Sequence, residues 1–356
     1  MNTRKNKGLS IVIPCLNEKD TIEEAIKKAS TAGKKYLNGN FELIVADNGS
    51  TDGSIEIVKK QMVARLIRVP VRGYGAALHW GILNAKKDYV LFADADLSYD
   101  FFEINRFLKF LDKDLDLVLG TRLKGKIEKN SMPFLNRYIG TPLLTLLIRV
   151  IYGLNTTDCN SGMRMIKKSF YKELNMRNSG MEWASELLLK TALHAGRYAE
   201  TPITFYKDRR GKPPHLLRWS DGWRHLKAIV LIKPNCLFGP LLILVALTSF
   251  FLKRSFDLTF FLSLLSGSLF LSILAAKMLN YAIDNKKSRL ISILNRIPLA
   301  VLAIVATFIA FISLFVISNQ HLGTKLFIAS SVIIFNIWVF LMETIKTHLI
   351  NPLPKT

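Results

Sequence analysis

The chain has 356 residues, with 49 lysines and arginines against 27 aspartates and glutamates, and its formal net charge at pH 7 is +22. This length leaves room for two domains, and three widely spaced cysteines exclude a disulfide framework and a zinc-ligand spacing. The first eight residues are polar and basic and the apolar run after them ends at Pro14, so no N-terminal signal peptide is expected.

The first 120 residues alternate between short apolar runs and amphipathic runs. Strands are expected at 9–14, 41–47, 64–69, 89–93 and 115–120, with helices from Thr21, over 54–63 and over 76–85. Apolar residues share one face of the first helix, at Ile22, Ala25, Ile26 and Ala29. Thr21 and Glu24 have the spacing of a capping box. Strands that alternate with helices predict an α/β domain with a parallel, doubly wound sheet.

Polar or glycine-rich residues come after each predicted strand where it ends. In chain order they are Pro14, Asn17, Glu18, Asp47, Gly73, Gly75, Asp94, Asp96 and Arg122. The carboxyl ends of parallel strands meet at one edge of a sheet, and open α/β sheets bind their ligands at that edge. We therefore expect these residues to form one site.

Asp94 and Asp96 are the most informative members of this set. Two carboxylates at a strand end suit a hard divalent cation that also holds substrate phosphates. Gly73 and Gly75 allow a ligand to approach the backbone closely, and Asp47 is placed to accept hydrogen bonds from a base or ribose. Taken singly, each has an ordinary alternative: a solvated acidic turn, a glycine turn, or an aspartate that caps its own turn.

The composition changes at Pro234, after which long apolar runs dominate. Four runs, each close to the ~20 residues that a helix needs to cross a bilayer, predict spans at 236–252, 256–279, 297–318 and 326–345. Buried core helices are the alternative. Lysine and arginine are denser in the loop between the second and third spans than in the outer turns, which favours a cytoplasmic N-terminal domain and C-terminus. We expect an integral membrane protein, with a cytoplasmic domain at 1–233 and a transmembrane domain at 234–356.

Two further segments predict helices that lie in the membrane interface. The segment 134–151 is apolar but carries two arginines and is interrupted by Pro142, which favours an interfacial helix over a spanning one. The segment 218–233 carries two tryptophans, which suit the level of the lipid headgroups. Basic residues gather between positions 207 and 233, beside the apolar half, and this placement favours anionic lipid or a phosphate near the membrane over nucleic acid.

An ordered set of motifs carries a family resemblance over residues 9 to about 233. The segments are Ile13–Glu18, Val45–Asp52, Gly73–Ala77, Asp94–Ser98, Gly120–Arg122, Asn136–Arg137, Asp158–Gly162, Gly180–Glu186 and Asp208–Lys212. With them the chain resembles the family 2 glycosyltransferases of GT-A fold, and this resemblance implies an α/β domain with a Rossmann-like, mostly parallel sheet. It is most similar to polyprenyl-phosphate glycosyltransferases of the dolichol-phosphate mannose or glucose synthase type.

On the donor side, the resemblance implies that Pro14, Glu18 and Asp47 hold the nucleotide base and ribose. Asp94 and Asp96 would bind the nucleotide and a Mg²⁺ or Mn²⁺ ion that bridges the diphosphate, with Asp96 favoured as the direct ligand. The other residues implied in nucleotide-sugar binding are Asn17, Gly73, Gly75, Ala95 and Ser98.

On the acceptor side, the resemblance implies that arginines grip a lipid phosphate, because the planar guanidinium binds phosphate at two points. The residues concerned are Arg122, Arg137 and a basic residue among Arg209, Arg210 and Lys212. Glu182 or Glu186 lies where related enzymes place an acceptor-side carboxylate. Either one orients the acceptor, or both are ordinary helix residues.

The expected function is that of a membrane-bound inverting glycosyltransferase. It would move one sugar from a UDP- or GDP-sugar to a polyprenyl phosphate on the cytoplasmic leaflet. Two departures from the family pattern, Asn48 in place of a second acid and Ser98 in place of glutamine, leave the sugar and nucleotide open. A homo-oligomer is also left open.

Three other functions stay open at this point. His215-Leu-Leu-Arg-Trp219 is similar to the Gln-x-x-Arg-Trp motif of processive polysaccharide synthases, with histidine in place of glutamine. The membrane half would itself be the functional unit in a lipid-linked sugar flippase, or in a scaffold with an inactive transferase domain. A nucleotidyltransferase that uses sugar phosphates would also bind nucleotide on such a sheet, but it gives no reason for four spans.

Overall fold

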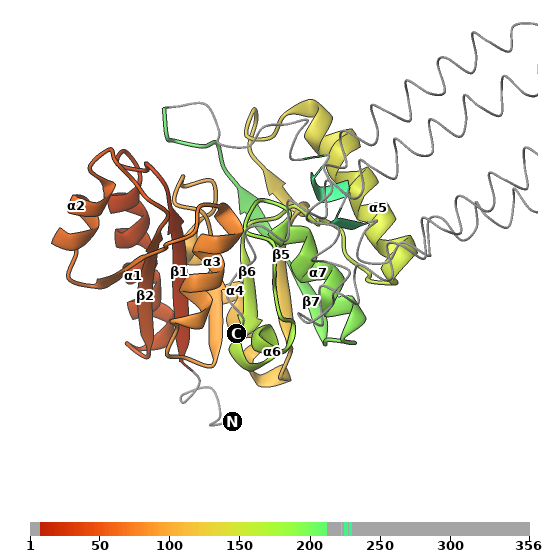
Figure 1. The fold of residues 1–356 in the computed structure, drawn as a ribbon, viewed down its shortest axis with the longest axis horizontal. Coiled ribbons are helices and arrows are strands. Elements are labelled where there is room, and N and C mark those ends of the chain that lie inside the picture. Colours follow the sequence, from red (N-terminus) through yellow and green to blue (C-terminus); the bar gives the residue numbers. More distant parts are fainter. Residues whose placement is uncertain (1–7, 212–221, 223, 227, 230–356) are drawn as a thin grey trace, which may run out of the picture. The chain divides into compact units, whose positions relative to one another are not determined.

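The computed structural model describes residues 8–211, 222, 224–226 and 228–229 (Figure 1). The four predicted spans, and Lys212, lie outside these described residues. Within the described part of the chain, no helix combines the length and the apolar character that crossing a membrane requires.

Within the described residues, seven strands form one sheet, in the order β3-β2-β1-β4-β6-β5-β7. Their bounds are β1 (Leu9–Cys15), β2 (Phe41–Asp47), β3 (Ala64–Arg68), β4 (Tyr89–Phe92), β5 (Leu117–Ile127), β6 (Arg164–Lys167) and β7 (Tyr198–Phe205). Only β6 runs antiparallel to its neighbours, β4 and β5. The mostly parallel α/β sheet is therefore confirmed, and its first four strands lie where the sequence predicts them.

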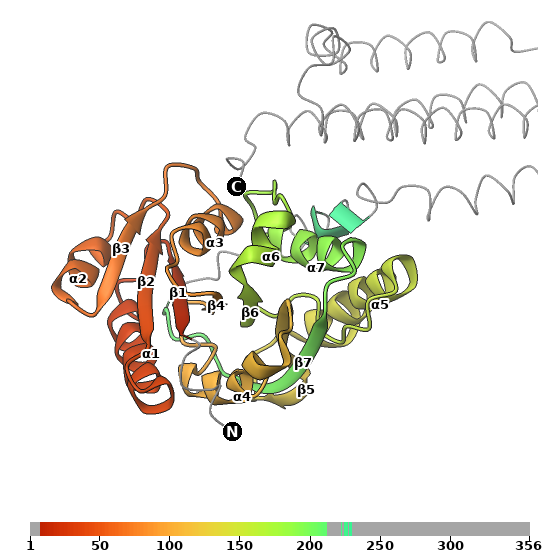
Figure 2. The ribbon, with the colours of Figure 1, turned by 90° about the horizontal axis from the view of Figure 1, so that it is seen from below.

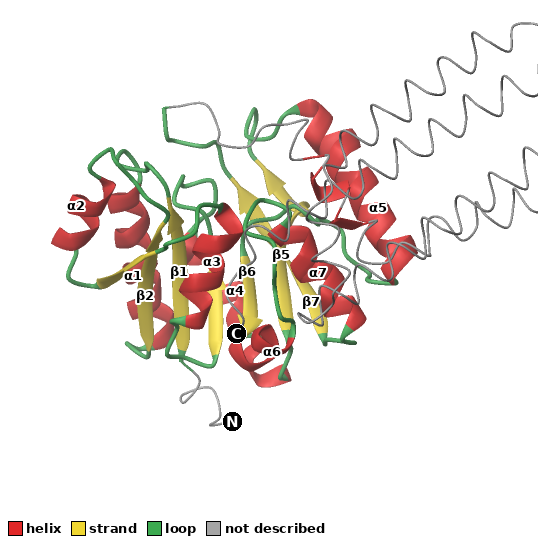
Figure 3. Cartoon of the chain, in the orientation of Figure 1, coloured by secondary structure: helices red, strands yellow, loops and turns green. Residues whose placement is uncertain are grey.

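Helices cover both faces of the sheet. They are α1 (Ile22–Leu37), α2 (Ser54–Lys60), α3 (Tyr74–Leu83), α4 (Ile104–Leu108), α5 (Thr141–Tyr152), α6 (Lys168–Glu173) and α7 (Trp183–Leu193), with short turns η2 (Phe101–Glu103), η3 (Leu111–Lys113) and η4 (Asn136–Gly140). Helices α3, α6 and α7 lie on one face, and α1 and α4 lie on the other (Figure 2). In Figure 3 the yellow strands therefore form the middle layer between red helices.

Helix α1 shows how local pattern and packing agree. The four apolar positions predicted to share a face are all buried, and full burial of an isoleucine such as Ile22 stabilises the fold by about 1.5–3 kcal/mol. Lys34 and Lys35 in the last turn suit the helix dipole, and the helix ends at Asn38 in the left-handed conformation. The predicted capping box is wrong. Thr21 makes no side-chain cap bond, because its hydroxyl turns back to Glu18.

The predicted interfacial segment 134–151 is helical. The π-helical turn η4 leads directly into α5, and Pro142 lies in the first turn of α5. Proline has no N–H to donate, so it is tolerated where the hydrogen-bond pattern changes from one type of turn to the other. Pro142 therefore marks a junction within the segment instead of interrupting the helix.

Candidate active site

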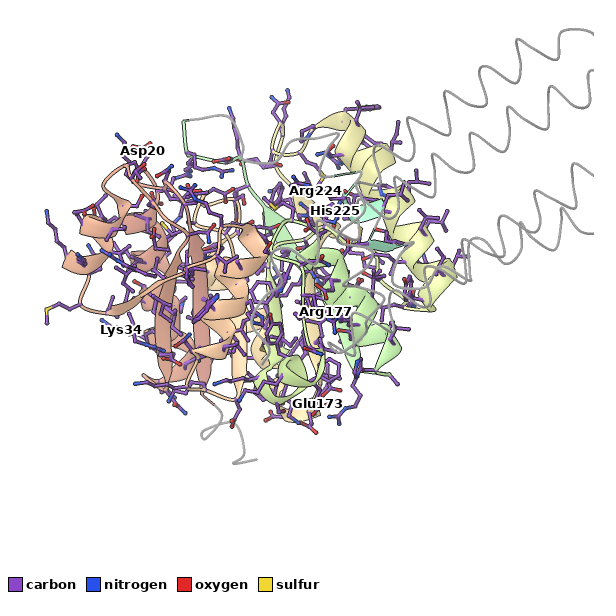
Figure 4. The ribbon with its side chains drawn as sticks, in the orientation of Figure 1. Asp20, Lys34, Glu173, Arg177, Arg224 and His225 are labelled. Carbon is purple, nitrogen blue, oxygen red and sulfur yellow. The ribbon has the colours of Figure 1, made fainter. Side chains whose placement is uncertain are left out.

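The strands other than β6 run in one direction, so their carboxyl ends share one edge of the sheet. Asp20, in the loop after β1, lies along this edge at the top of Figure 4, whereas Glu173 at the end of α6 lies at the opposite edge. The carboxyl ends of β1, β2 and β4 and the loops after them carry most of the predicted donor-side residues. Arg122 is an exception to the predicted pattern, because β5 continues to Ile127 and Arg122 lies within the strand.

The Asp94 and Asp96 carboxylates, which come after β4, are held by different partners. Asp94 Oδ1 accepts a hydrogen bond of 2.8 Å from the Tyr74 hydroxyl. Asp96 Oδ1 accepts bonds from the backbone N–H and the hydroxyl of Ser98, at 2.9 and 2.6 Å. Leu97 between them has a φ of 65°, a region that a leucine rarely adopts. This strained turn fixes the orientation of Asp96, and backbone strain of this kind is typical of functional sites.

Arg210, from the loop after β7, lies against Asp96 and against Glu18 from the loop after β1. Its guanidinium is 3.2 Å from Glu18 Oε1 and 3.2 Å from Asp96 Oδ2. Asp208 accepts two further bonds from the same guanidinium, at 2.8 and 2.6 Å. Only 13% of the Arg210 side chain is exposed. The sequence predicted Arg210 as a possible lipid-phosphate ligand. It did not predict that Arg210 would pair with Glu18 and with Asp96, the favoured metal ligand.

Burial makes these carboxylates hard to ionise. Loss of water raises the pKa of Glu18 to about 7, and Arg210 opposes this rise. Loss of water, followed by repulsion from Asp96, raises the pKa of Asp94 to about 7. Burial also raises the pKa of Asp96, against the influence of Arg210. A cation brought to this cluster would favour the ionised forms and would in turn be bound by them.

The carboxylates of Asp94 and Asp96 fit a divalent cation that takes its remaining ligands from the phosphates of a substrate. Asp94 and Asp96 supply carboxylate oxygens, which are the ligands that Mg²⁺ and Mn²⁺ prefer. Within residues 8–211 and the described part of 222–229, no cluster of three or more acidic, histidine or cysteine side chains could enclose a metal. A cation held by one or two carboxylates and completed by phosphate oxygens matches this arrangement.

The loops after β1 and β2 hold each other through side chains. Asp47 accepts hydrogen bonds from the N–H groups of Gly49 and Ser50. It therefore caps its own turn, which the sequence left open as the alternative to a role in nucleotide binding. Asn17 has a φ of 56° and accepts a bond from Thr51 N–H at 2.8 Å. Pro14 lies within β1 and pairs with Ala46. The nucleotide role of Pro14, Asn17 and Asp47 stays a prediction.

Asn48 connects two loops of the candidate site, although the sequence singled it out only as a departure from the family pattern. Its amide donates to Val71 O at 2.8 Å and accepts from Gly73 N–H at 2.7 Å. An aspartate could accept but could not donate. Asn48 therefore ties the loop after β2 to the loop that precedes α3.

Gly73 and Gly75 were expected to let a ligand approach the backbone closely. In the structure, other residues of the protein lie close to both glycines. A Cβ on Gly73 would lie 2.1 Å from Ser179 O, and a Cβ on Gly75 would lie 2.4 Å from Trp183 Cβ. Ala76 N–H also donates to Ser179 O at 3.0 Å. The glycines thus join the donor-side loop to the segment that carries Glu182, and a role toward a ligand stays a prediction.

The predicted acceptor-side arginines have different surroundings. Arg122 is buried and donates from Nε and Nη2 to Asp158 at 2.8 and 2.7 Å. Arg137 is half-buried in η4, with its guanidinium 5.2 Å from the centre of the Tyr138 ring. Arg209 is 62% exposed and lies 3.6 Å from Glu24. The three arginines therefore have separate partners, and their role toward a lipid phosphate stays a prediction.

The two candidate acidic residues near α7 also differ. Glu186 accepts from the N–H groups of Arg177 and Asn178 and pairs with Lys190, so it shapes the loop before the helix. Glu182 is 6% exposed, and its Oε2 has no hydrogen-bond partner within the described residues. This geometry favours Glu182 as the residue available to a ligand.

Comparison with known proteins places this geometry in a family. Residues 10–174 match the family model described as glycosyl transferase family 2. A low-salt glycan biosynthesis hexosyltransferase, Agl6, from Haloferax volcanii is 35% identical over 65% of this chain, and the chain spans only about half of that relative, 55%. A dolichyl-phosphate hexose transferase from the same organism is 30% identical over 57% of this chain and 85% of its own length.

The fold has solved counterparts. Glucosyl-3-phosphoglycerate synthase from Mycobacterium tuberculosis, in complex with Mn²⁺, UDP and glucosyl-3-phosphoglycerate, matches with a TM-score of 0.51 and 21% identity, over 64% of this chain and 80% of that one. This likeness shows that the mostly parallel sheet is of the GT-A type. By its sequence relatives and its fold, the chain belongs to glycosyl transferase family 2.

Proposed function

We propose that this protein is a membrane-bound inverting glycosyltransferase that moves one sugar from a UDP- or GDP-sugar to a polyprenyl phosphate on the cytoplasmic leaflet. The observation that carries this proposal is the carboxylate cluster of Glu18, Asp94 and Asp96 at the carboxyl edge of the sheet. The names of the relatives support the transfer of a hexose and a dolichyl phosphate acceptor.

The donor would bind over the ends of β1, β2 and β4. Asp96 and Asp94 would hold Mg²⁺ or Mn²⁺, and the bound cation would stabilise the charge that develops on the diphosphate leaving group. Glu18 and Asp47 would contact the base and ribose. Solved structures of the mycobacterial synthase with UDP and Mn²⁺, or with UDP and Mg²⁺, support a metal-assisted donor site on this fold.

The acceptor would reach the site from the side of α5. This helix packs Leu144 and Ile148 inward, and Leu143, Leu146 and Val150 are more than half exposed. An apolar exposed face suits a lipid surface, and Arg137 at the start of the segment would bind the lipid phosphate. A phosphate monoester is already largely ionised at neutral pH, so its oxygen can attack the anomeric carbon directly, and a single displacement inverts the configuration.

The test is to incubate the purified full-length protein with polyprenyl phosphate, Mg²⁺ or Mn²⁺, and a panel of labelled UDP- and GDP-sugars. A lipid that carries one sugar is expected with one donor, and Asp96→Ala should lower its formation at least about 10²-fold while the protein stays folded. A polymeric product would replace the proposal with a processive synthase. Full activity in a metal chelator would remove the metal from it, and no glycolipid with any donor would refute it.

A further inference from the structure

Two neighbouring arginines in the loop after β7 have opposite environments. The Arg209 side chain is 62% exposed, and among the described residues its guanidinium pairs with the exposed Glu24 at 3.6 Å. Arg210 is enclosed by Glu18, Asp96 and Asp208, with N–O distances of 2.6 to 3.2 Å. The enclosed guanidinium therefore provides a positive charge at the point where the proposed donor site needs a cation.

The backbone fixes Arg210 in this position. Tyr206 N–H donates to Ser98 O at 2.9 Å, and Arg209 N–H donates to Asp96 O at 3.1 Å. Asp208 then accepts from the Arg210 backbone N–H at 2.8 Å and from its guanidinium. The loop after β7 thus lies along the turn that carries Asp96 and Ser98. Its residue Asp208 orients the Arg210 side chain toward Asp96.

This arrangement leaves Asp96 with little room for a second cation. Its Oδ1 accepts two bonds from Ser98, and its Oδ2 faces the Arg210 guanidinium at 3.2 Å. A divalent ion bound directly to Asp96 would lie within a few ångströms of that guanidinium, and like charges in a poorly hydrated site repel strongly.

We infer that Arg210 is a built-in counter-cation of the donor site, which holds Glu18 and Asp96 while the site is empty and withdraws from Asp96 when metal and nucleotide bind. The inference rests on the proposed function, because it takes Asp96 as the metal ligand. A nucleotide diphosphate gives the released guanidinium new anionic partners, since arginine binds phosphate oxygens at two points. The metal alone offers no such partner. Arg210 therefore makes metal binding depend on the nucleotide.

The test measures Mn²⁺ binding to the full-length protein by the loss of the free-ion electron paramagnetic resonance signal, without nucleotide and then with UDP or GDP. Wild type should bind Mn²⁺ weakly without nucleotide. Arg210→Ala should bind it about 10-fold more tightly, a change typical of coupled binding events. Arg209→Ala is the matched control, because it removes the same charge one residue away, and its Mn²⁺ affinity should equal that of wild type.

Two results would overturn the inference in distinguishable ways. If wild type binds Mn²⁺ with nucleotide but Arg210→Ala gains no affinity without it, Arg210 does not compete with the metal and the proposed function stands. If no protein binds Mn²⁺ even with UDP or GDP, the proposed metal site fails and the inference fails with it. Arg210→Gln, which keeps most of the side-chain volume, replaces Arg210→Ala if circular dichroism shows that the alanine variant is unfolded, and the same gain is expected.

Discussion

The guanidinium of Arg122 is buried, and Asp158 binds it through two side-chain bonds and also accepts from its backbone N–H. Burial alone would lower the pKa of Arg122, and the charge of the Asp158 carboxylate outweighs it and raises that pKa above its ordinary value. Two of the donors that would grip a lipid phosphate are thus already engaged. At the scale of the residue, pairing inside the domain decides which arginines can reach a ligand.

Asp158→Ala should destabilise the domain by about 3–5 kcal/mol, because it leaves a buried guanidinium without its counter-ion. The loss is measured as the fall in the free energy of unfolding in urea. Lys28→Ala is the control, since it breaks the exposed Lys28–Glu24 pair on α1, and a loss of about 0.5 kcal/mol or less is expected there. Equal losses in the two variants would show that the buried pair is not special.

At the scale of the element, the segment that carries His225 and Ile229 contacts both α7 and α5. Ser185 of α7 makes a bond of 2.8 Å with Nδ1 of His225, which comes from the described part of residues 222–229 and is labelled in Figure 4. Tyr152 at the end of α5 donates to Ile229 O at 2.5 Å. These contacts connect α5 and α7, which carry the proposed acceptor side, through one short segment.

The contact between Ser185 and His225 is expected to be sensitive to acid. Burial lowers the pKa of His225 from 6.5 to about 4, so the unfolded chain takes up a proton at a higher pH than the folded chain does. The stability contributed by neutral His225 is complete above about pH 6.5 and is lost as the pH falls toward about 4, by about 3 kcal/mol in total. Urea unfolding across this range should show the slope in wild type and a smaller slope in His225→Asn. Identical slopes would contradict the prediction.

A second prediction at this scale concerns the close packing of Gly75, at the start of α3, against Trp183. Gly75→Ala places a methyl group 2.4 Å from Trp183 Cβ and 2.7 Å from Asn178 O, so the backbone must shift, and a loss of about 1–3 kcal/mol is expected. Gly222→Ala is the control, because no atom of the described residues lies within 4 Å of its Cβ position. Thermal unfolding of the two variants checks this. A Gly75→Ala variant as stable as wild type would show that the contact between α3 and α7 is loose.

At the scale of the whole molecule, the exposed side of α5 belongs to the proposed acceptor route. Leu146 and Val150 are 54% and 74% exposed, although the helix is otherwise packed on the domain. Large exposed apolar groups in a row mark a surface that meets another apolar surface. Here the proposed partner is the lipid that carries the acceptor phosphate.

The double variant Leu146→Asp, Val150→Asp should raise the KM for a long-chain polyprenyl phosphate about 10-fold, because charge on this face opposes contact with lipid. The KM for a short, water-soluble isoprenyl phosphate should stay unchanged. Leu193→Asp, at an exposed apolar residue at the end of α7, is the control and should change neither constant. An equal rise for both acceptors would assign α5 to the fold and not to the lipid.

The sequence by itself determined the first four strands, the edge of the sheet that carries the candidate site, and the aspartates on it. These features depend on apolar periodicity and on the residue types directly after each strand, and both are local properties of the chain. The family was predicted from ordered motifs and is confirmed. The prediction of four spans rests on the same kind of local evidence.

Only the tertiary structure decided the reversed direction of β6, the pairing of Arg122 with Asp158, the approach of Gly73 to Ser179, and the enclosure of Arg210 by Glu18 and Asp96. Each of these joins residues far apart in the chain; Glu18 and Arg210 are 192 positions apart. A charged residue has the same local pattern whether it faces solvent or a carboxylate. Its role is decided by the partners that folding brings to it.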